Sequence, residues 1–281
     1  MRNRILAGVG VAALATVGIA APAAATTAGT ADLYVVHGFP GEAGTFPVDI
    51  YANGSPVDGL QGVDFGDFTA EPLALPADTY ALEVFAAGTT EAPALELEAT
   101  LAAGDSVTVV AHADADGAPV INAFPNNVSE IAAGEARLTV RHTAAAPAVD
   151  VLSDGAVVAP FENVANPGAA DLDLAAGVVP AVAVAATGTT DPVIGPIDLD
   201  LAAGTNTLVH AIGSLEQDNL ELAVITIDGL GAAPEGVPAG SAGLVAEGGN
   251  AGLIGAGVAL MLAALAAVGI VVRRKTVSAE R

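Results

Sequence analysis

Histidine and aspartate recur at matching places in two parts of the chain. His37 is followed by Asp49, and His142 is followed by Asp150. Imidazole titrates near neutral pH and binds metals. A histidine beside an aspartate could therefore serve as an acid–base pair or as a metal ligand. The same residues could instead form hydrogen-bonded structural pairs that tie a loop to a strand, because buried polar groups usually satisfy one another. These four are our candidate binding residues, and we favour the structural role.

A second candidate for chemistry is the segment Asp114-Ala115-Asp116-Gly117, which begins like a calcium-binding loop. Hard cations need several oxygen ligands that converge from one loop. The position where a twelve-residue EF-hand would place its bidentate glutamate holds Pro125, so the motif is incomplete. Asp114 and Asp116 are therefore candidate ligands of Ca²⁺, the one cofactor we consider. The competing interpretation is that the acidic residues form a solvated face.

Other catalytic chemistry has no sequence support. The chain has no cysteine, which excludes thiolate zinc sites and cysteine nucleophiles. It has only four histidines, and it contains no G-x-S-x-G, H-E-x-x-H or phosphate-binding glycine loop. We therefore expect a protein without catalytic activity.

The charge of the chain is strongly one-sided, with 32 acidic residues against eight Lys and Arg. Six of the eight basic residues lie close to the two ends. Between residues 26 and 272 only Arg137 and Arg141 remain, against 31 carboxylates, so the net charge of this part is 2 − 31, about −29. Such a field repels nucleic acid and anionic lipid headgroups and attracts cations.

The sequence between these ends repeats itself about every 100 residues. Leu101-Ala102-Ala103-Gly104 recurs as Leu201-Ala202-Ala203-Gly204, and the histidine and aspartate positions above recur with it. An internal repeat of this length predicts two copies of one structural unit. We expect domains at residues 31–128 and 135–228.

Each copy contains short apolar segments, often alternating with polar residues and separated by Gly, Pro, Asn and Asp. This pattern is typical of strands in an antiparallel sandwich. Asn53-Gly54 and Asp154-Gly155 occupy matching positions and predict two-residue hairpin turns. The predicted fold is therefore all-β, with two tandem antiparallel, immunoglobulin-like β-sandwiches. The strands we expect cover residues 79–85, 94–101, 106–111, 178–185, 194–201 and 205–212.

The two ends of the chain are apolar and carry basic flanks. Residues 1–25 have a basic start, an apolar stretch and an Ala-Ala-Ala run, which predicts a signal peptide. Residues 251–272 are uncharged and as a helix would be about 33 Å long, enough to cross a bilayer core of roughly 30 Å. Basic residues follow at once, so residues 273–281 would be a cytoplasmic tail. Residues 229–250, rich in Gly, Ala and Pro, would be a flexible stalk.

Three motifs of the first copy resemble the bacterial domain of unknown function 4397 (DUF4397) family. They are Val35-Val36-His37, Pro47-Val48-Asp49-Ile50-Tyr51 and Leu75-Pro76-Ala77-Asp78-Thr79-Tyr80, where Asp78 replaces the usual glycine. The second copy keeps the His, Pro, Val-Asp-Val and Gly of the pattern, but it has Leu152 for the tyrosine of the second motif and Ala175 for the proline of the third. The resemblance implies exported, β-rich surface domains, and it implies no activity.

Together these features predict a single-pass type I membrane protein with its domains outside a bacterial cell. We expect a structural or adhesion-like interaction module, whose partner is an envelope protein, a surface protein or a wall component. The alternative is an extracellular receptor domain that binds cations or a solute. The Ala- and Gly-rich, Lys-poor composition is typical of actinobacteria or of salt-adapted organisms.

Overall fold

The computed structural model describes residues 29–41 and 46–232. All regular structure in these residues is β-strand, so the all-β prediction is confirmed. Nothing in this part of the chain is a helix long and apolar enough to cross a membrane. The predicted signal peptide, transmembrane helix and basic tail, and all but the first four residues of the predicted stalk, lie outside the described residues.

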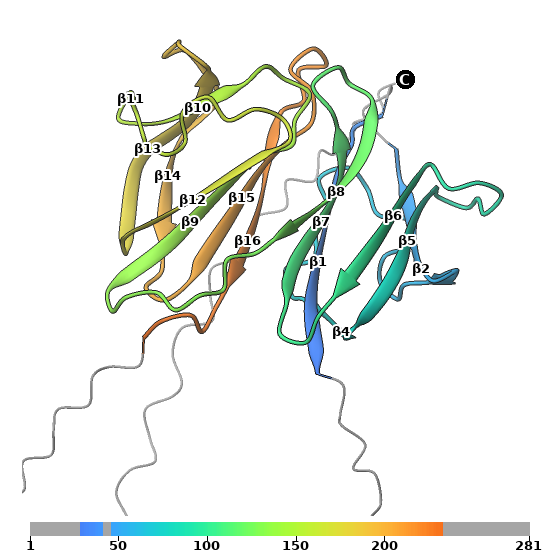
Figure 1. Ribbon diagram of the computed structural model, residues 1–281. Coiled ribbons are helices and arrows are strands. Elements are labelled where there is room, and N and C mark those ends of the chain that lie inside the picture. The colour runs from blue at the N-terminus through green and yellow to red at the C-terminus, as the bar shows by residue number, and fades with distance from the viewer. Residues whose placement is uncertain (1–28, 42–45, 233–281) are drawn as a thin grey trace, which may run out of the picture. The chain divides into compact units, whose positions relative to one another are not determined.

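The chain forms eight strands in each repeat (Figure 1). Those of repeat 1 are β1 (Thr30–Gly38), β2 (Val48–Ala52), β3 (Ser55–Pro56), β4 (Leu73–Pro76), β5 (Asp78–Ala86), β6 (Leu95–Leu101), β7 (Ser106–Ala113) and β8 (Pro119–Pro125). Those of repeat 2 are β9 (Glu135–His142), β10 (Val149–Ser153), β11 (Ala156–Val157), β12 (Gly168–Ala175), β13 (Gly177–Ala186), β14 (Pro192–Leu201), β15 (Asn206–Ile212) and β16 (Glu221–Ile227).

Both repeats arrange their strands in the same order. Repeat 1 has the sheets β4-β1-β7-β8 and β3-β2-β5-β6, and repeat 2 has β12-β9-β15-β16 and β11-β10-β13-β14. Two features differ from our prediction. The pairs β1–β7 and β9–β15 are parallel, so one sheet of each repeat is mixed rather than antiparallel. The first two strands lie in different sheets, whereas the constant-type immunoglobulin order places them in one sheet.

The predicted hairpin turns are confirmed at both positions. Asn53 and Gly54 join β2 to β3, and Asp154 and Gly155 join β10 to β11. All four residues have positive φ, between 49° and 77°. This is the backbone that a type I′ turn requires and that Asn, Asp and Gly adopt most easily. The turns fix the register of the strands that carry Asp49 and Asp150.

Each repeat has its own apolar core between its two sheets. Leu33 and Val35 of β1 meet Ile50 of β2 and Val84 of β5 in repeat 1. The corresponding strands supply the core of repeat 2, around the fully buried Phe161. Each repeat is therefore a sandwich of two packed sheets.

A third apolar cluster joins the two repeats. Tyr34 and Val36 lie on the face of β1 opposite to its sandwich core, and they pack with side chains of repeat 2. Strands β1 and β15 are thus buried on both faces along most of their length. The two repeats therefore pack directly on each other. The buried members of this cluster are Tyr34, Val36, Val110, Leu208, Ile212, Ala223, Ile225 and Ile227.

Close backbone approach marks the same interface. A Cβ atom on Gly38 would lie 2.7 Å from Cγ2 of Ile212, so only glycine fits there without movement. The N–H of Gly213 donates to the carbonyl of Gly38 over 3.3 Å. Beyond β16, Leu230 donates to the carbonyl of Gly204 and accepts from the N–H of Ile131. The first residues of the segment that we expected to be a stalk are therefore bonded to repeat 2 and to Ile131, which lies between β8 and β9.

Candidate functional site

The two candidate histidines occupy equivalent buried positions. His37 is the second-last residue of β1 and His142 is the last residue of β9, and each is about 1% exposed. Nε2 of His37 lies 2.7 Å from the carbonyl oxygen of Phe46, and Nε2 of His142 lies 3.0 Å from that of Pro147. Since a carbonyl only accepts, each Nε2 carries the hydrogen. Burial lowers the pKa of both imidazoles, although these hydrogen bonds oppose the shift. Both side chains are neutral ties between the first strand and the loop before the second.

The two candidate aspartates bind backbone N–H groups. The carboxylate of Asp49 accepts from Gly62 over 2.7 Å and from Gly88 over 2.8 Å. Asp150 makes the matching contacts, at 2.7 Å to the N–H of Asn163 and 2.9 Å to that of Gly188. Each carboxylate therefore joins two loops that are distant in the sequence.

The histidines and aspartates of the predicted pairs are not bonded to each other. Each bonds to backbone groups instead, and no hydrogen bond joins His37 to Asp49, or His142 to Asp150, in the described residues. The structural role we favoured is met by contacts with the backbone rather than by a His–Asp pair. These contacts leave no donor–acceptor relay of the kind that general-base chemistry uses.

The Asp150 contacts predict a measurable effect of acid. Hydrogen bonds from the N–H groups of Asn163 and Gly188, helped by the Thr187 hydroxyl, lower the pKa of Asp150 below its ordinary value of 3.8. Its stabilising contribution is thus complete above the unfolded pKa and is lost as the pH falls through the folded one. We expect Asp150→Asn to melt at a lower temperature at pH 7, and to lose less than the wild type between pH 5 and pH 3.

Thermal melting followed by circular dichroism would measure this. Asp154→Asn is the matched control, because Asp154 lies exposed in the adjacent turn and tolerates asparagine at its positive φ. Equal melting temperatures of Asp150→Asn and the wild type at both pH values would contradict the proposed role of this carboxylate.

The candidate calcium residues form the hairpin turn between β7 and β8. Oδ1 of Asp114 accepts from the N–H of Asp116 over 2.9 Å and from the N–H of Ala118 over 2.8 Å. Asp114 is thus an Asx-turn residue that closes the hairpin. Over residues 29–41 and 46–232, no three His, Asp or Glu side chains gather as a metal site would require.

Sequence reasoning did not identify the buried polar group that centres on Arg141. This side chain is about 1% exposed and lies where the two repeats meet. Its Nη2 donates to Oδ1 of Asn126 over 2.7 Å and to the carbonyl of Pro125 over 3.1 Å, and its Nη1 donates to Nε2 of His210 over 3.1 Å. The guanidinium also lies 5.1 Å from the ring centre of Phe124. Arg141 therefore bonds residues of both repeats.

Electrostatics at this group follow from burial. Desolvation lowers the pKa of Arg141 to about 10. Desolvation and the positive charge of Arg141 lower the pKa of His210 to about 3, against a weaker opposing bond to the carbonyl of Ala223. Because Nε2 of His210 accepts from Arg141, its Nδ1 carries the hydrogen. His210 is a neutral acceptor at physiological pH.

The second arginine of the described region has a different environment. Nε and Nη2 of Arg137 donate to both carboxylate oxygens of Asp173 over 2.6 and 2.8 Å, which is a bidentate ion pair. Its Nη1 donates to the carbonyls of Asn127 and Ser129, which follow β8. Both arginines could have been singled out from the sequence as candidates for buried or paired side chains. Arg137 and Arg141 are the only basic residues of an acidic region, and their even spacing places them on one face of β9.

Part of the chain matches a known protein family. Residues 31–152 match the family described as Domain of unknown function (DUF4397). Over this stretch the chain is DUF4397-like. The predicted resemblance is thereby confirmed for these residues, and no curated protein matches the chain. The DUF4397 match covers all eight strands of repeat 1 and continues through β9 into β10.

The DUF4397 motifs have structural explanations here. The Val-Val-His motif ends β1 at the bond from His37 to the following loop, and the Val-Asp-Ile motif is the part of β2 that places Asp49. In the third motif, the hydroxyl of Tyr80 donates to the carbonyl of Pro76 over 2.9 Å and closes the turn between β4 and β5. The motif residues of the matched region hold loops to strands.

Proposed function

We propose that this protein is a cell-surface module of a bacterial envelope that acts by structure and interaction and has no catalytic activity. The observation that carries the proposal is the use of the His and Asp candidates. His37, His142, Asp49 and Asp150 all bond to backbone groups, and these bonds maintain the fold. What remains available to partners is strand edges, loops and an acidic surface.

The proposal includes a single-pass type I anchor with the repeats outside the cell. Its support is the sequence pattern of residues 1–25 and 251–281. Two repeats that share a buried interface would present one unit at the surface. The partner would be an envelope protein, a surface protein or a wall component.

Cross-linking tests this proposal directly. Intact cells that make the protein are treated with a membrane-impermeant cross-linker that reacts with carboxylates, because the predicted exterior part has no lysine, and the full-length chain is then purified and its adducts identified. We expect envelope adducts, and we expect the purified chain to turn over no substrate in a broad hydrolase screen. Turnover that disappears in His37→Gln or Asp49→Asn would contradict the proposal, as would a chain protected from the cross-linker.

Cation binding is a second candidate, favoured by the distribution of charge. The described residues contain 28 carboxylates, and their only two basic side chains, Arg137 and Arg141, are both buried. The surface of this part of the chain therefore exposes no Lys or Arg side chain. Self-repulsion among surface carboxylates destabilises a compact state, and salt screens it.

Thermal melting separates screening from a specific site. We expect the melting temperature of the full-length protein to rise in NaCl, and to rise equally in CaCl₂ at matched ionic strength. A larger rise in CaCl₂ that saturates at millimolar concentration would reveal preferential binding to the folded state. That result would place cation binding before the structural role, and Asp114→Asn with Asp116→Asn would then test the turn as its site.

A further inference from the structure

One side of repeat 2 combines exposed apolar side chains with two strands that end their sheets. β14 is the last strand of the sheet β11-β10-β13-β14, and β16 is the last strand of β12-β9-β15-β16. Ile197 on β14 is 44% exposed and Val224 on β16 is 36% exposed. Large aliphatic side chains exposed side by side at the rim of a core are typical of binding surfaces.

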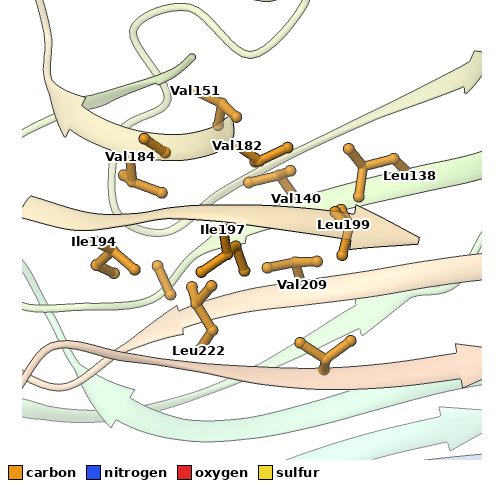
Figure 2. A pocket seen from close by; sticks show the side chains of 13 residues that line it. Leu138, Val140, Val151, Val182, Val184, Ile194, Ile197, Leu199, Val209 and Leu222 are labelled. Carbon is orange, nitrogen blue, oxygen red and sulfur yellow. The ribbon is translucent and has the colours of Figure 1, made fainter. Parts of the chain in front are cut away.

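Between these strands lies an apolar hollow in the core of repeat 2 (Figure 2). Its volume is about 40 Å³, and Ile194, Ile197 and Leu199 of β14 line it together with Leu222 and Val224 of β16. All thirteen lining residues are aliphatic, so the hollow offers water no hydrogen-bond partner. The hollow in the core of repeat 1 has no residue of β6, the counterpart of β14, in its lining. Contact between the hollow and the last strand of this sheet is therefore a feature of repeat 2.

The backbone of β14 is also free on one side. β14 pairs with β13 and with no other strand of the described residues, so one row of its N–H and C=O groups is unpaired. Such an edge is a template for an added strand. Pro192 and Pro196 remove two donors from β14, but the stretch from Ile197 to Leu201 contains no proline. An added strand can therefore pair with this second half.

The side chains of β14 define what that strand would carry. Ile197 and Leu199 line the hollow, whereas Asp198 and Asp200 are exposed carboxylates. An added strand has alternating side chains, so one set would cover the hollow and the other would lie beside the two aspartates. The first set must be aliphatic, and charge complementarity requires the second set to be basic. A second copy of β14 would bring its own aspartates to this place, which like-charge repulsion disfavours.

We propose that the edge of β14 binds an extended segment of a partner protein in which aliphatic residues alternate with Lys or Arg. The segment adds a strand to the sheet, closes the apolar hollow and neutralises Asp198 and Asp200. This inference rests on the proposed function as an interaction module and names its contact surface. It assigns the contact to repeat 2, beyond the DUF4397-like stretch.

A pair of synthetic peptides tests the proposal with the full-length protein. One peptide alternates Lys and Val over ten residues, and the other has the same composition in a block of Lys followed by a block of Val. We expect the alternating peptide to bind at least about tenfold tighter by fluorescence anisotropy. Hydrogen exchange should slow in the backbone of residues 197–201 when it binds.

Two variants show whether the apolar rim is responsible. Ile197→Asp should weaken binding of the alternating peptide at least about tenfold. Val157→Asp is the matched control, because Val157 is an exposed valine on β11, at the other end of the same sheet, and does not line the hollow, and it should change the affinity less than twofold. Asp198→Asn with Asp200→Asn should weaken binding and reduce its dependence on salt.

Several results would overturn the assignment. Equal binding of the two peptides would mean that charge alone attracts them, and protection outside β14 would move the site elsewhere. Self-association in sedimentation that Ile197→Asp abolishes would identify a second copy as the occupant. Envelope cross-links that persist in Ile197→Asp would reject this surface and leave the proposed function standing, whereas their absence from the wild type would reject the proposed function itself.

Discussion

Leu208→Ala should lower the free energy of unfolding by about 2–5 kcal/mol, and it should destabilise both repeats together. Leu208 lies on β15 of repeat 2, but it is fully buried in the cluster shared with Tyr34, Val36 and Val110 of repeat 1. Truncation removes apolar contact and leaves a cavity at the junction. Because each repeat covers a face of the other, loss of packing there should weaken the whole unit.

Tyrosine fluorescence makes this coupling measurable. The chain has three tyrosines and no tryptophan, and Tyr34, Tyr51 and Tyr80 all belong to repeat 1. Urea unfolding of Leu208→Ala should therefore shift the midpoint of the tyrosine signal, although the substitution is in repeat 2. Val178→Ala, at an exposed site of repeat 2, should leave that midpoint unchanged. If circular dichroism shifted and the tyrosine midpoint did not, the repeats would fold independently.

The strands could be predicted because their signals are local. Alternation, turn residues and the internal repeat located β5, β6 and β7 and their counterparts β13, β14 and β15 to within two residues. The turns at Asn53 and Asp154 were equally clear, since positive φ restricts residue choice. The sheet order was not predictable, because parallel pairing of β1 with β7 depends on how the whole chain crosses between sheets.

The sequence of β15 only partly shows that this strand lies at the interface between the repeats. In β15 all seven residues are buried, because Val209 points into the sandwich while Leu208 and Ile212 point toward repeat 1. A continuous apolar run would mark a strand covered on both faces, but Asn206, Thr207 and His210 interrupt the apolar sequence of β15. One sequence cannot say whether the second face meets its own chain or another molecule, so the packing of the repeats had to come from the structure.

The hydrogen-bond partners of the candidate polar residues could not be predicted from the sequence either. His37 and Asp49 were recognised as a recurring feature, and both are buried, but they bond to backbone groups and not to each other as the favoured pair would. Their partners, the carbonyl of Phe46 and the N–H groups of Gly62 and Gly88, are backbone atoms. Every residue type supplies such groups, so residue identity cannot reveal them. Arg141 differs, because Arg137 and Arg141 are the only basic residues between residues 26 and 272, and the sequence shows this directly.

Acid should destabilise the junction through His210. Its pKa is about 3 in the folded chain because of burial and the nearby Arg141, against an ordinary value of 6.5. Below pH 6.5 the His210 imidazole is therefore protonated in the unfolded chain but stays neutral in the folded chain until the pH approaches 3. The contribution of this neutral imidazole is complete above pH 6.5 and is lost as the pH falls toward 3, at about 1.4 kcal/mol per pH unit. The lowered pKa values of His37 and His142 act in the same direction.

Urea unfolding between pH 8 and pH 5 would measure the contribution of His210 to the free energy of unfolding while the carboxylates stay largely ionised. His210→Gln keeps an oxygen that can accept from Arg141 and removes the titration, so its free energy of unfolding should depend less steeply on pH. Leu208→Ala serves as a control for lost stability alone, because it should lower the free energy of unfolding at every pH and keep the wild-type slope. An unchanged slope in His210→Gln would show that this histidine is not the group that acid charges, and that the Arg141 contact does not keep it neutral.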